Sequence, residues 1–342
     1  MHHTARAFWV RAPGEGEIRT VELPTAGPDD VVVRTRFSAV SRGTETLVFR
    51  GGVPASQHAR MRAPFQVGEF PAPVEYGYLN VGEVEDGPPE LVGKTVFCLA
   101  PHRTRYVVPA GAVTPVPDTV PAARAVLAGT VETAVNALWD AAPLVGDRIA
   151  VIGGGMVGCC VAALLARIPE VRVELVDVDP ARAGVAAALG VGFAAPADAA
   201  GDCDLVVHAS ATDAGLARSL ELLADEGEVL ELSWYGDRPV TLPLGEAFHS
   251  RRLTIRASQV GTVSRARRGR RSYADRMALA LRLLADPVFD TLITREIRFA
   301  DLPREMPWIT GEPSALCVRV NYDNERTPER SDRCSPSPCA IT

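Results

Sequence analysis

Lysine is almost absent from this chain: Lys94 is the only lysine among 36 basic residues in a total of 342. Aromatic residues are also scarce, at 6%. Because 42 acidic residues leave a net charge of −6, the charge balance does not favour nucleic acid or an anionic membrane surface as a partner. The arginine excess has the character of a compositional bias, which weakens any functional interpretation of arginine clusters.

The sequence also lacks long apolar runs and paired cysteine motifs. No stretch approaches the ~20 residues that a membrane-spanning helix needs. The first residues do not combine a basic region with an apolar one, so we expect no secretory signal. The seven cysteines form no CxxC motif, which favours a reducing cytoplasm. We therefore expect a soluble cytoplasmic protein, with two domains at about 150 residues each.

Two kinds of pattern divide the chain. Up to residue 121, short strand-like runs separated by glycine and proline indicate a small barrel or sandwich, with runs at 31–37, 81–85 and 107–108. Beyond residue 121, buried strands alternate with helices, which predicts an α/β fold with a doubly wound parallel sheet. The expected strands are 149–152, 171–176, 205–207, 229–232 and 253–255, and the expected helices are 122–141, 161–168, 181–189 and 273–285.

The domain boundaries follow from this change of pattern. We expect residues 1–121 to form the first part of a β-rich domain and residues 122–289 to form the parallel-sheet domain. Residues 290–321 contain two further strand-like runs and are expected to return to the first domain. Residues 322–342 are polar and rich in proline, serine and arginine, which indicates a disordered tail.

A G-x-G-x-x-G motif follows the expected strand at 149–152 and opens a helix. The first glycine permits a tight turn, the second lets the backbone approach a pyrophosphate, and the third lets the helix pack on the strand. Unpaired N–H groups and the helix dipole then attract the phosphates. The motif predicts a dinucleotide site formed by Gly153, Gly155, Met156, Val157 and Gly158.

An acidic residue stands where such a site needs one. Asp177 ends the next expected strand and lies 177 − 158 = 19 residues beyond the last glycine. A carboxylate there accepts hydrogen bonds from the ribose hydroxyls of NAD and repels the 2′-phosphate of NADP. Asp179 could serve instead, and Arg182 leaves room for NADP. We expect NAD as the cofactor.

With this order of domains, the chain resembles the medium-chain dehydrogenase/reductase superfamily over residues 5 to 321. The resemblance implies a GroES-like catalytic domain, a Rossmann cofactor domain and a cleft between them. Within the superfamily the chain is most similar to the bacteriochlorophyllide a dehydrogenase branch, which oxidises a hydroxyethyl side chain to an acetyl group. That similarity rests on the segments at 38–45, 233–238 and 247–249.

Zinc-dependent members of the superfamily hold the metal with a cysteine, a histidine and a third Cys, Asp or Glu. Matched by motif, these positions are Ser41, the segment Gly77-Tyr78-Leu79 and Gly129 in this chain. None is a good ligand for tetrahedral zinc. The four-cysteine lobe of the superfamily is also missing, so the resemblance implies an enzyme without zinc. A metal held by other ligands, such as His102, Glu45 and Glu132, is the alternative.

Without zinc, other side chains at or beside these positions must transfer the proton. The candidates are Thr44, Glu45, Tyr78 and Glu132. Each has a structural alternative: Thr44 could cap a helix, Glu45 could face a helix dipole, Tyr78 could pack in the core and Glu132 could be a structural hydrogen-bonding group. The lone His102 is expected in a loop and is more often solvated than functional.

The resemblance adds two cofactor contacts. Arg42 follows the first vacated metal position, and in the superfamily that residue often faces the pyrophosphate; its guanidinium suits phosphate geometry. A surface arginine is the alternative. Thr133 matches a threonine that lies near the nicotinamide in the superfamily. The strand near residue 253 often pairs across a dimer in these proteins, so the resemblance also implies a homodimer.

These observations favour an NAD(H)-dependent, zinc-independent oxidoreductase that interconverts a secondary alcohol and a ketone on a sizeable small molecule. One alternative is an NADPH-dependent quinone or enone reductase, because zinc-free relatives often reduce conjugated double bonds. Another is a nucleotide-binding protein without catalytic activity, which the missing metal ligands make conceivable.

Overall fold

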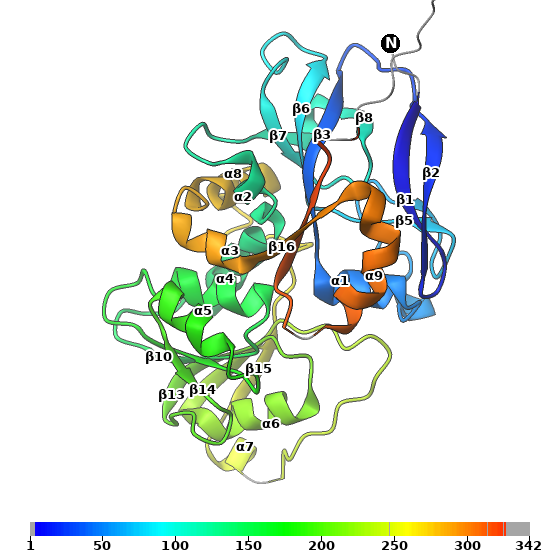
Figure 1. The fold of residues 1–342 in the computed structure, drawn as a ribbon. Coiled ribbons are helices and arrows are strands. Elements are labelled where there is room, and N and C mark those ends of the chain that lie inside the picture. The colour runs from blue at the N-terminus through cyan, green and yellow to red at the C-terminus, as the bar shows by residue number, and fades with distance from the viewer. Residues whose placement is uncertain (1–3, 246, 313, 324, 326–342) are drawn as a thin grey trace, which may run out of the picture.

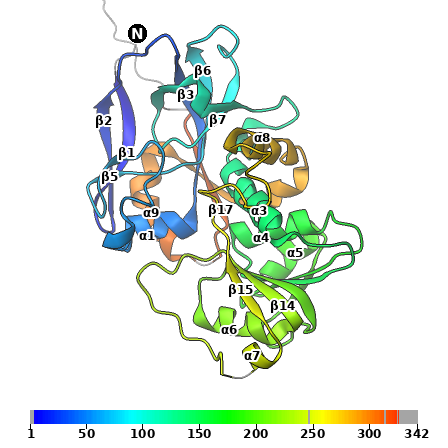
Figure 2. The same ribbon diagram turned by 180° about the vertical axis from the view of Figure 1, so that it is seen from behind.

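The computed structural model describes residues 4–245, 247–312, 314–323 and 325. Two lobes lie side by side: one contains the N-terminal strands, and the other contains helices around a parallel sheet (Figures 1 and 2). The last segment, drawn in orange to red in Figure 1, runs back to the N-terminal lobe. The order of elements therefore matches a β-rich domain interrupted by an α/β domain.

The β-rich lobe consists of two sheets. The first has the strand order β2-β1-β5-β4, and the second has the order β16-β17-β3-β6-β7-β9, with β8 also paired to β3. In β3 alternate residues from Val31 to Phe37 are buried, because one face of the strand covers the core. The elements of this lobe before residue 121 are β1 (Thr4–Ala12), β2 (Glu15–Glu22), β3 (Asp30–Val40), α1 (Arg42–Phe49), η1 (Ala55–Gln57), β4 (Val67–Gly68), β5 (Val74–Glu75), β6 (Asn80–Asp86), β7 (Thr95–Cys98), β8 (Arg105–Pro109), η2 (Ala110–Ala112) and β9 (Val113–Pro115).

The second lobe is built on a parallel sheet with the order β12-β11-β10-β13-β14-β15. In this sheet β11 lies on one side of β10 and β13 lies on the other. The order in which strands are added to the sheet therefore reverses at β10. This is the doubly wound arrangement predicted above. The elements are α2 (Ala122–Ala125), α3 (Ala128–Ala141), β10 (Arg148–Ile152), α4 (Met156–Leu165), β11 (Arg172–Val176), α5 (Arg182–Leu189), β12 (Gly192–Ala194), β13 (Cys203–His208), α6 (Asp213–Leu222), β14 (Leu223–Glu231), α7 (Ala247–Ser250), β15 (Thr254–Ala257) and α8 (Tyr273–Leu283).

Two helix predictions need correction. The helix expected at 161–168 begins five residues earlier, at Met156, because the glycine turn itself forms its N-cap. The helix expected at 122–141 is two helices, α2 and α3. Between them the N–H groups of Leu127 and Thr130 bond to carbonyls three residues back, at Arg124 and Leu127, and this tighter turn interrupts the α-helix.

The segment after α8 joins the first lobe through η3 (Pro287–Leu292), β16 (Ile293–Arg298), η4 (Phe299–Asp301), α9 (Leu302–Gly311) and β17 (Cys317–Asn321). β17 pairs antiparallel with β3, with Val318 opposite Val40. Tyr322, which we assigned to the tail, is instead 4% exposed and stacks on Phe299, so the folded chain extends past residue 321. Residues 324 and 326–342 lie outside the described residues, and the tail prediction is untested there.

Candidate active site

The glycine turn between β10 and α4 has the geometry that the motif predicts. Gly153 has φ +106°, and a Cβ there would lie 2.7 Å from the Ser210 nitrogen. A Cβ on Gly158 would lie 2.0 Å from the Gly153 carbonyl oxygen, whereas one on Gly155 would meet no atom within 4 Å. Gly155 is the N-cap of the ten-residue helix α4. The turn therefore leaves open backbone at the positive end of a helix, a geometry that attracts anionic groups.

Asp177 is attached directly to this turn. Its Oδ2 accepts from the Gly154 N–H at 2.6 Å, and its Oδ1 accepts from the Asp179 N–H at 2.8 Å. Each oxygen keeps a further lone pair with which it could accept from a ribose hydroxyl. The hydrogen bond to Gly154 links the residues that follow β10 and β11. The carboxylate of Asp177 is therefore fixed relative to the glycine turn.

Two arginines lie near Asp177. Arg182 begins α5, is 5% exposed and approaches Asp179 at 3.7 Å. Arg42 begins α1 in the other lobe, and its guanidinium donates to the Glu312 carbonyl. Burial, followed by the charge of Arg182, lowers the pKa of Arg42, while the charges of Glu312 and Asp177 raise it. The two cations thus lie close enough to each other and to Asp177 to interact electrostatically.

Three of the four catalytic candidates lie together at the start of α1. The Tyr78 hydroxyl donates to Ser41 Oγ at 2.5 Å, and Glu45 Oε1 accepts from the Ser41 N–H at 2.7 Å. Burial, with a smaller contribution from the Glu45 charge, raises the pKa of Tyr78 to about 12, although hydrogen bonding with Ser41 and Thr44 opposes the shift. Tyr78 is therefore a neutral donor at physiological pH. The helix starts at Arg42, so Thr44 lies in its first turn and not at its cap.

His102 is not a solvated loop residue, contrary to our expectation. It is 1% exposed, and its Nε2 lies 2.9 Å from Glu45 Oε2. Its Nδ1 lies 2.7 Å from Ser38 Oγ, which also lies 2.9 Å from the Tyr322 hydroxyl. Glu45 is consequently held at both oxygens, by backbone on one side and by imidazole on the other. Sequence reasoning missed this role because the partners of His102 are 57 and 64 residues away.

Glu132 does not join this group. Its Oε1 accepts from Arg276 Nε at 3.0 Å, and the guanidinium also donates to Asn136 Oδ1 at 2.6 Å. Arg276 is 2% exposed and links α3 to α8, which makes the pair part of the packing between helices. Burial raises the pKa of Glu132, and the guanidinium opposes that shift. Thr133, the next residue, donates its hydroxyl to the Gly129 carbonyl at 3.0 Å.

The three positions that the sequence resemblance assigns to metal ligands lie near one another, and none carries a side chain typical of a zinc ligand. Ser41 is hydrogen-bonded to Tyr78, and a Cβ on Gly129 would lie 2.6 Å from Leu79 Cδ2, so an apolar side chain fills this space. Tetrahedral zinc needs three or four N, S or O ligands, and these residues offer two hydroxyls. Within the described part of the chain, no group of three or more His, Cys, Asp or Glu side chains could hold a metal ion.

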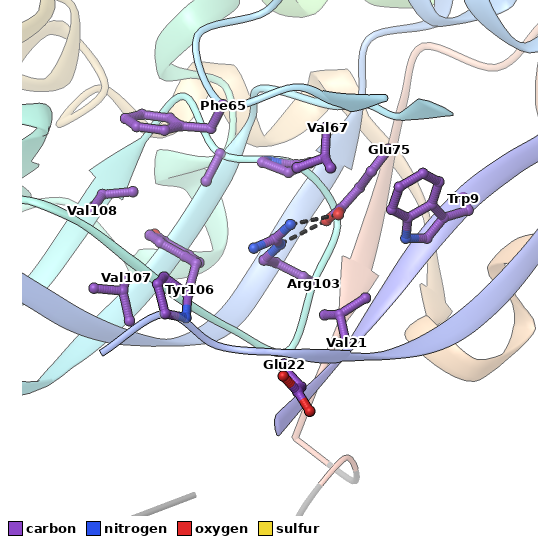
Figure 3. Close-up of a pocket in the computed structure, with 13 residues that line it drawn as sticks. Trp9, Val21, Glu22, Phe65, Val67, Glu75, Arg103, Tyr106, Val107 and Val108 are labelled. Atoms are coloured by element: carbon purple, nitrogen blue, oxygen red, sulfur yellow. Dashed lines mark hydrogen bonds and ion pairs between the residues drawn. The ribbon is translucent and has the colours of Figure 1, made fainter. Parts of the chain in front are cut away.

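A cavity of about 320 Å³ lies away from these residues, in the β-rich lobe (Figure 3). The Arg103 guanidinium forms a bidentate ion pair with Glu75, which is fully buried, and Trp9, Val67 and Phe65 surround it. None of the residues predicted for the cofactor or for catalysis lines this cavity.

A parallel sheet with a glycine turn, joined to a β-rich domain, is a fold that this chain shares with solved structures of dehydrogenases. A dehydrogenase from Sinorhizobium meliloti, described as zinc-binding and bound to NADP, superposes with a TM-score of 0.75 and 16% identity; the match covers 93% of this chain and 99% of that one. An alcohol dehydrogenase from Escherichia coli CFT073, complexed with NADH, has a TM-score of 0.74 and 15% identity, with 93% and 99% covered. These likenesses establish the fold.

The sequence comparisons are more limited. L-threonine 3-dehydrogenase of Deinococcus radiodurans is 27% identical over 213 residues, which are 54% of this chain and 60% of that protein. The match therefore spans less than two thirds of that relative. No protein-family model matches the chain.

No helix among the described residues is long and apolar enough to cross a membrane.

Proposed function

We propose that this protein is an NAD(H)-dependent oxidoreductase that interconverts a secondary alcohol and a ketone without zinc. The observation that carries the proposal is the hydrogen bond between Asp177 and the Gly154 N–H, which holds the carboxylate beside the glycine turn and supports a role for it in binding the ribose. The names of the relatives, a threonine dehydrogenase and an alcohol dehydrogenase complexed with NADH, support the same class of reaction.

The cofactor would lie across the carboxyl edge of the parallel sheet. In the proposal, Asp177 accepts from the adenosine ribose, and the N–H groups at the start of α4 (Gly155, Met156 and Val157) bind the pyrophosphate. Arg42 supports the pyrophosphate from the other lobe. NADP is the second candidate cofactor, because Arg42 lies close to Arg182. Two cations beside Asp177 could donate hydrogen bonds to a 2′-phosphate.

The proton chemistry is assigned to the group at the start of α1. The cofactor, when bound, supplies or accepts the hydride. Tyr78 is neutral, with a pKa raised to about 12, and in the proposal its single hydroxyl hydrogen turns from Ser41 to the substrate oxygen when substrate binds, with Thr44 beside it. Glu45 is a positioning residue, because its two oxygens are held by Ser41 and His102. The proposal leaves Glu132 out of the catalytic set, because its pairing with Arg276 between two helices supports a structural role.

The nature of the substrate follows from the sequence resemblance. The segments at 38–45 and 233–238 are similar to a branch of enzymes that convert a hydroxyethyl group into an acetyl group, which supports a secondary alcohol on a sizeable molecule. We also propose a homodimer. Among the described strands, β15 is the last in the order of its sheet. Its outer edge is therefore available to pair with a second copy of the chain.

The test uses the purified full-length protein. Titration of NADH and NADPH, followed by fluorescence, measures the two dissociation constants; turnover is then measured with 2-alkanols, 2-alkanones and quinones. We expect tighter binding of NADH and reduction of 2-alkanones. Activity with NADPH and quinones alone would establish the reductase alternative, and binding without turnover would favour a non-catalytic protein. Stoichiometric zinc in elemental analysis would overturn the zinc-free part.

A further inference from the structure

A glutamate, a histidine and a serine are hydrogen-bonded in series at the carboxyl ends of β13 and β14. His208 ends β13, Glu231 ends β14, and the two residues are direct partners in the sheet register. His208 is fully buried; its Nδ1 lies 2.8 Å from Glu231 Oε2 and its Nε2 lies 2.7 Å from Ser210 Oγ. The function proposed above uses none of these three side chains.

The hydrogen bonds of Glu231 determine which atoms donate and which accept in this series. Burial acts to raise the pKa of Glu231, but hydrogen bonds from His208 and Ser233 outweigh it and hold the pKa below its usual value. The ionised carboxylate accepts from the Ser233 N–H at 2.7 Å and from the Tyr235 hydroxyl at 3.0 Å. The carboxylate can only accept, so His208 donates from Nδ1; in the corresponding neutral tautomer, on which the inference below is built, Nε2 accepts from the Ser210 hydroxyl.

Thr212 fixes the rest of the hydrogen bonding of Ser210. Thr212 is the N-cap of α6, and its Oγ1 accepts from the Gly215 N–H at 3.0 Å. Its own hydroxyl hydrogen is then free to bond to Ser210 Oγ, 2.9 Å away. Ser210 donates to His208 and accepts from Thr212, so one lone pair remains. The exposed side of Ser210 is therefore a hydrogen-bond acceptor, suited to a hydroxyl group of a ligand.

Ser210 lies beside the phosphate turn, on the side opposite Asp177. A Cβ on Gly153 would come within 2.8 Å of the Ser210 backbone, so the two segments are in contact. β13 adjoins β10 on one side, and β11, with Asp177 at its end, adjoins it on the other. A dinucleotide with its adenosine at Asp177 and its pyrophosphate at α4 must extend its second nucleoside toward β13.

We propose that Ser210 accepts a hydrogen bond from a hydroxyl of the nicotinamide ribose, and that His208 and Glu231 are positioning residues that orient the Ser210 hydroxyl. The inference rests on the function proposed above, because it requires the cofactor to occupy the glycine turn. It assigns a role to Glu231, beside the 233–238 segment that the sequence analysis singled out. It also explains why a partly buried carboxylate and a buried imidazole stand at two adjacent strand ends.

The experiment compares a whole cofactor with half of one. NADH carries both nucleosides, whereas ADP carries only the adenosine and the pyrophosphate. In Ser210→Ala we expect NADH to bind about fivefold more weakly, the effect of one lost hydrogen bond, while the affinity for ADP stays unchanged. Ser219→Ala is the matched control. Ser219 is a buried serine on α6 whose hydroxyl donates to the Gly215 carbonyl, and its loss should change neither affinity.

Glu231→Gln tests the positioning role. The Ser233 N–H fixes the amide oxygen at the Oε1 position, which places the NH₂ group against His208. His208 must then accept at Nδ1 and donate from Nε2, so His208 and Thr212 occupy both lone pairs of Ser210 Oγ and none is left to accept from the ribose hydroxyl. We expect a loss of NADH affinity similar to that in Ser210→Ala and no additional loss in the double variant, because both changes act through the same hydroxyl.

The outcomes separate the two proposals. If the wild-type protein binds neither NADH nor NADPH, the proposed function fails and this inference fails with it. If the wild type binds NADH and Ser210→Ala binds it equally well, only the inference is overturned. Equal losses of NADH and ADP affinity would mean that Ser210 supports the turn as a whole, which also contradicts the inference. Additive losses in the double variant would remove His208 and Glu231 from the positioning role.

Discussion

Glu45 and His102 face each other across 2.9 Å inside the β-rich lobe, with 3% and 1% of their surfaces exposed. Glu45 belongs to α1, and His102 lies in the segment before β8. Because Glu45 also accepts from the Ser41 N–H, and His102 also contacts Ser38 in β3, the pair ties the start of α1 to the sheet behind it. The position of Tyr78 and Thr44 depends on this connection.

Removal of the carboxylate should therefore destabilise the fold. In Glu45→Leu, His102 loses its partner while it remains buried, and we expect the free energy of unfolding to fall by about 3 kcal/mol. Urea denaturation measures it. Glu17→Ala is the control, because Glu17 is 40% exposed in its pair with Arg19 and should cost less than about 1 kcal/mol. Equal losses in the two variants would show that the buried pair is no stronger than a surface one.

The raised pKa of Tyr78 predicts a change of stability at high pH. An unfolded tyrosine titrates near pH 10, whereas burial raises the pKa of Tyr78 to about 12 in the fold. Between these values the folded state holds the proton that the unfolded state releases, so stability falls as pH rises. Tyr78→Phe removes this proton, and its stability should fall less steeply from pH 10 to 12, by up to about 1.4 kcal/mol per pH unit. Urea denaturation at several pH values compares the two proteins; other tyrosines contribute equally to both. Identical slopes would contradict the assignment.

Local signals made the glycine turn and the position of Asp177 beside it predictable from the sequence. The glycine motif and Asp177 stand at fixed distances along the chain, and the turn between β10 and α4 has the predicted form. The environment of His102 was not predictable, because its partners come from strands and helices far away in the sequence. The same holds for Glu132, whose partner Arg276 is 144 residues away. Spacing identifies contacts within one turn, whereas the pairing of buried charges depends on packing.

Asp177 should decide between the two forms of the cofactor. Asp177→Asn keeps the side-chain shape but removes the charge that repels a 2′-phosphate, with Arg182 nearby to attract it. We expect the preference for NADH over NADPH to fall at least about tenfold in fluorescence titrations. Asp179→Asn is the matched comparison, because Asp179 is two residues away and bonds to the Ala181 N–H. A larger change of preference in Asp179→Asn would move the ribose contact to that residue.

Two glycines of the phosphate turn should respond differently to the same substitution. In Gly158→Ala the new Cβ would lie 2.0 Å from the Gly153 carbonyl oxygen, so the helix must move and both stability and cofactor binding should be lost. In Gly155→Ala the Cβ meets no protein atom within 4 Å, and the unfolding midpoint should stay near that of the wild type. NADH should nevertheless bind at least about tenfold more weakly, because the methyl group occupies the space that the pyrophosphate needs. Thermal unfolding and NADH titration of both variants make the comparison. A Gly155→Ala protein that is stable and binds NADH normally would show that the cofactor phosphates lie elsewhere.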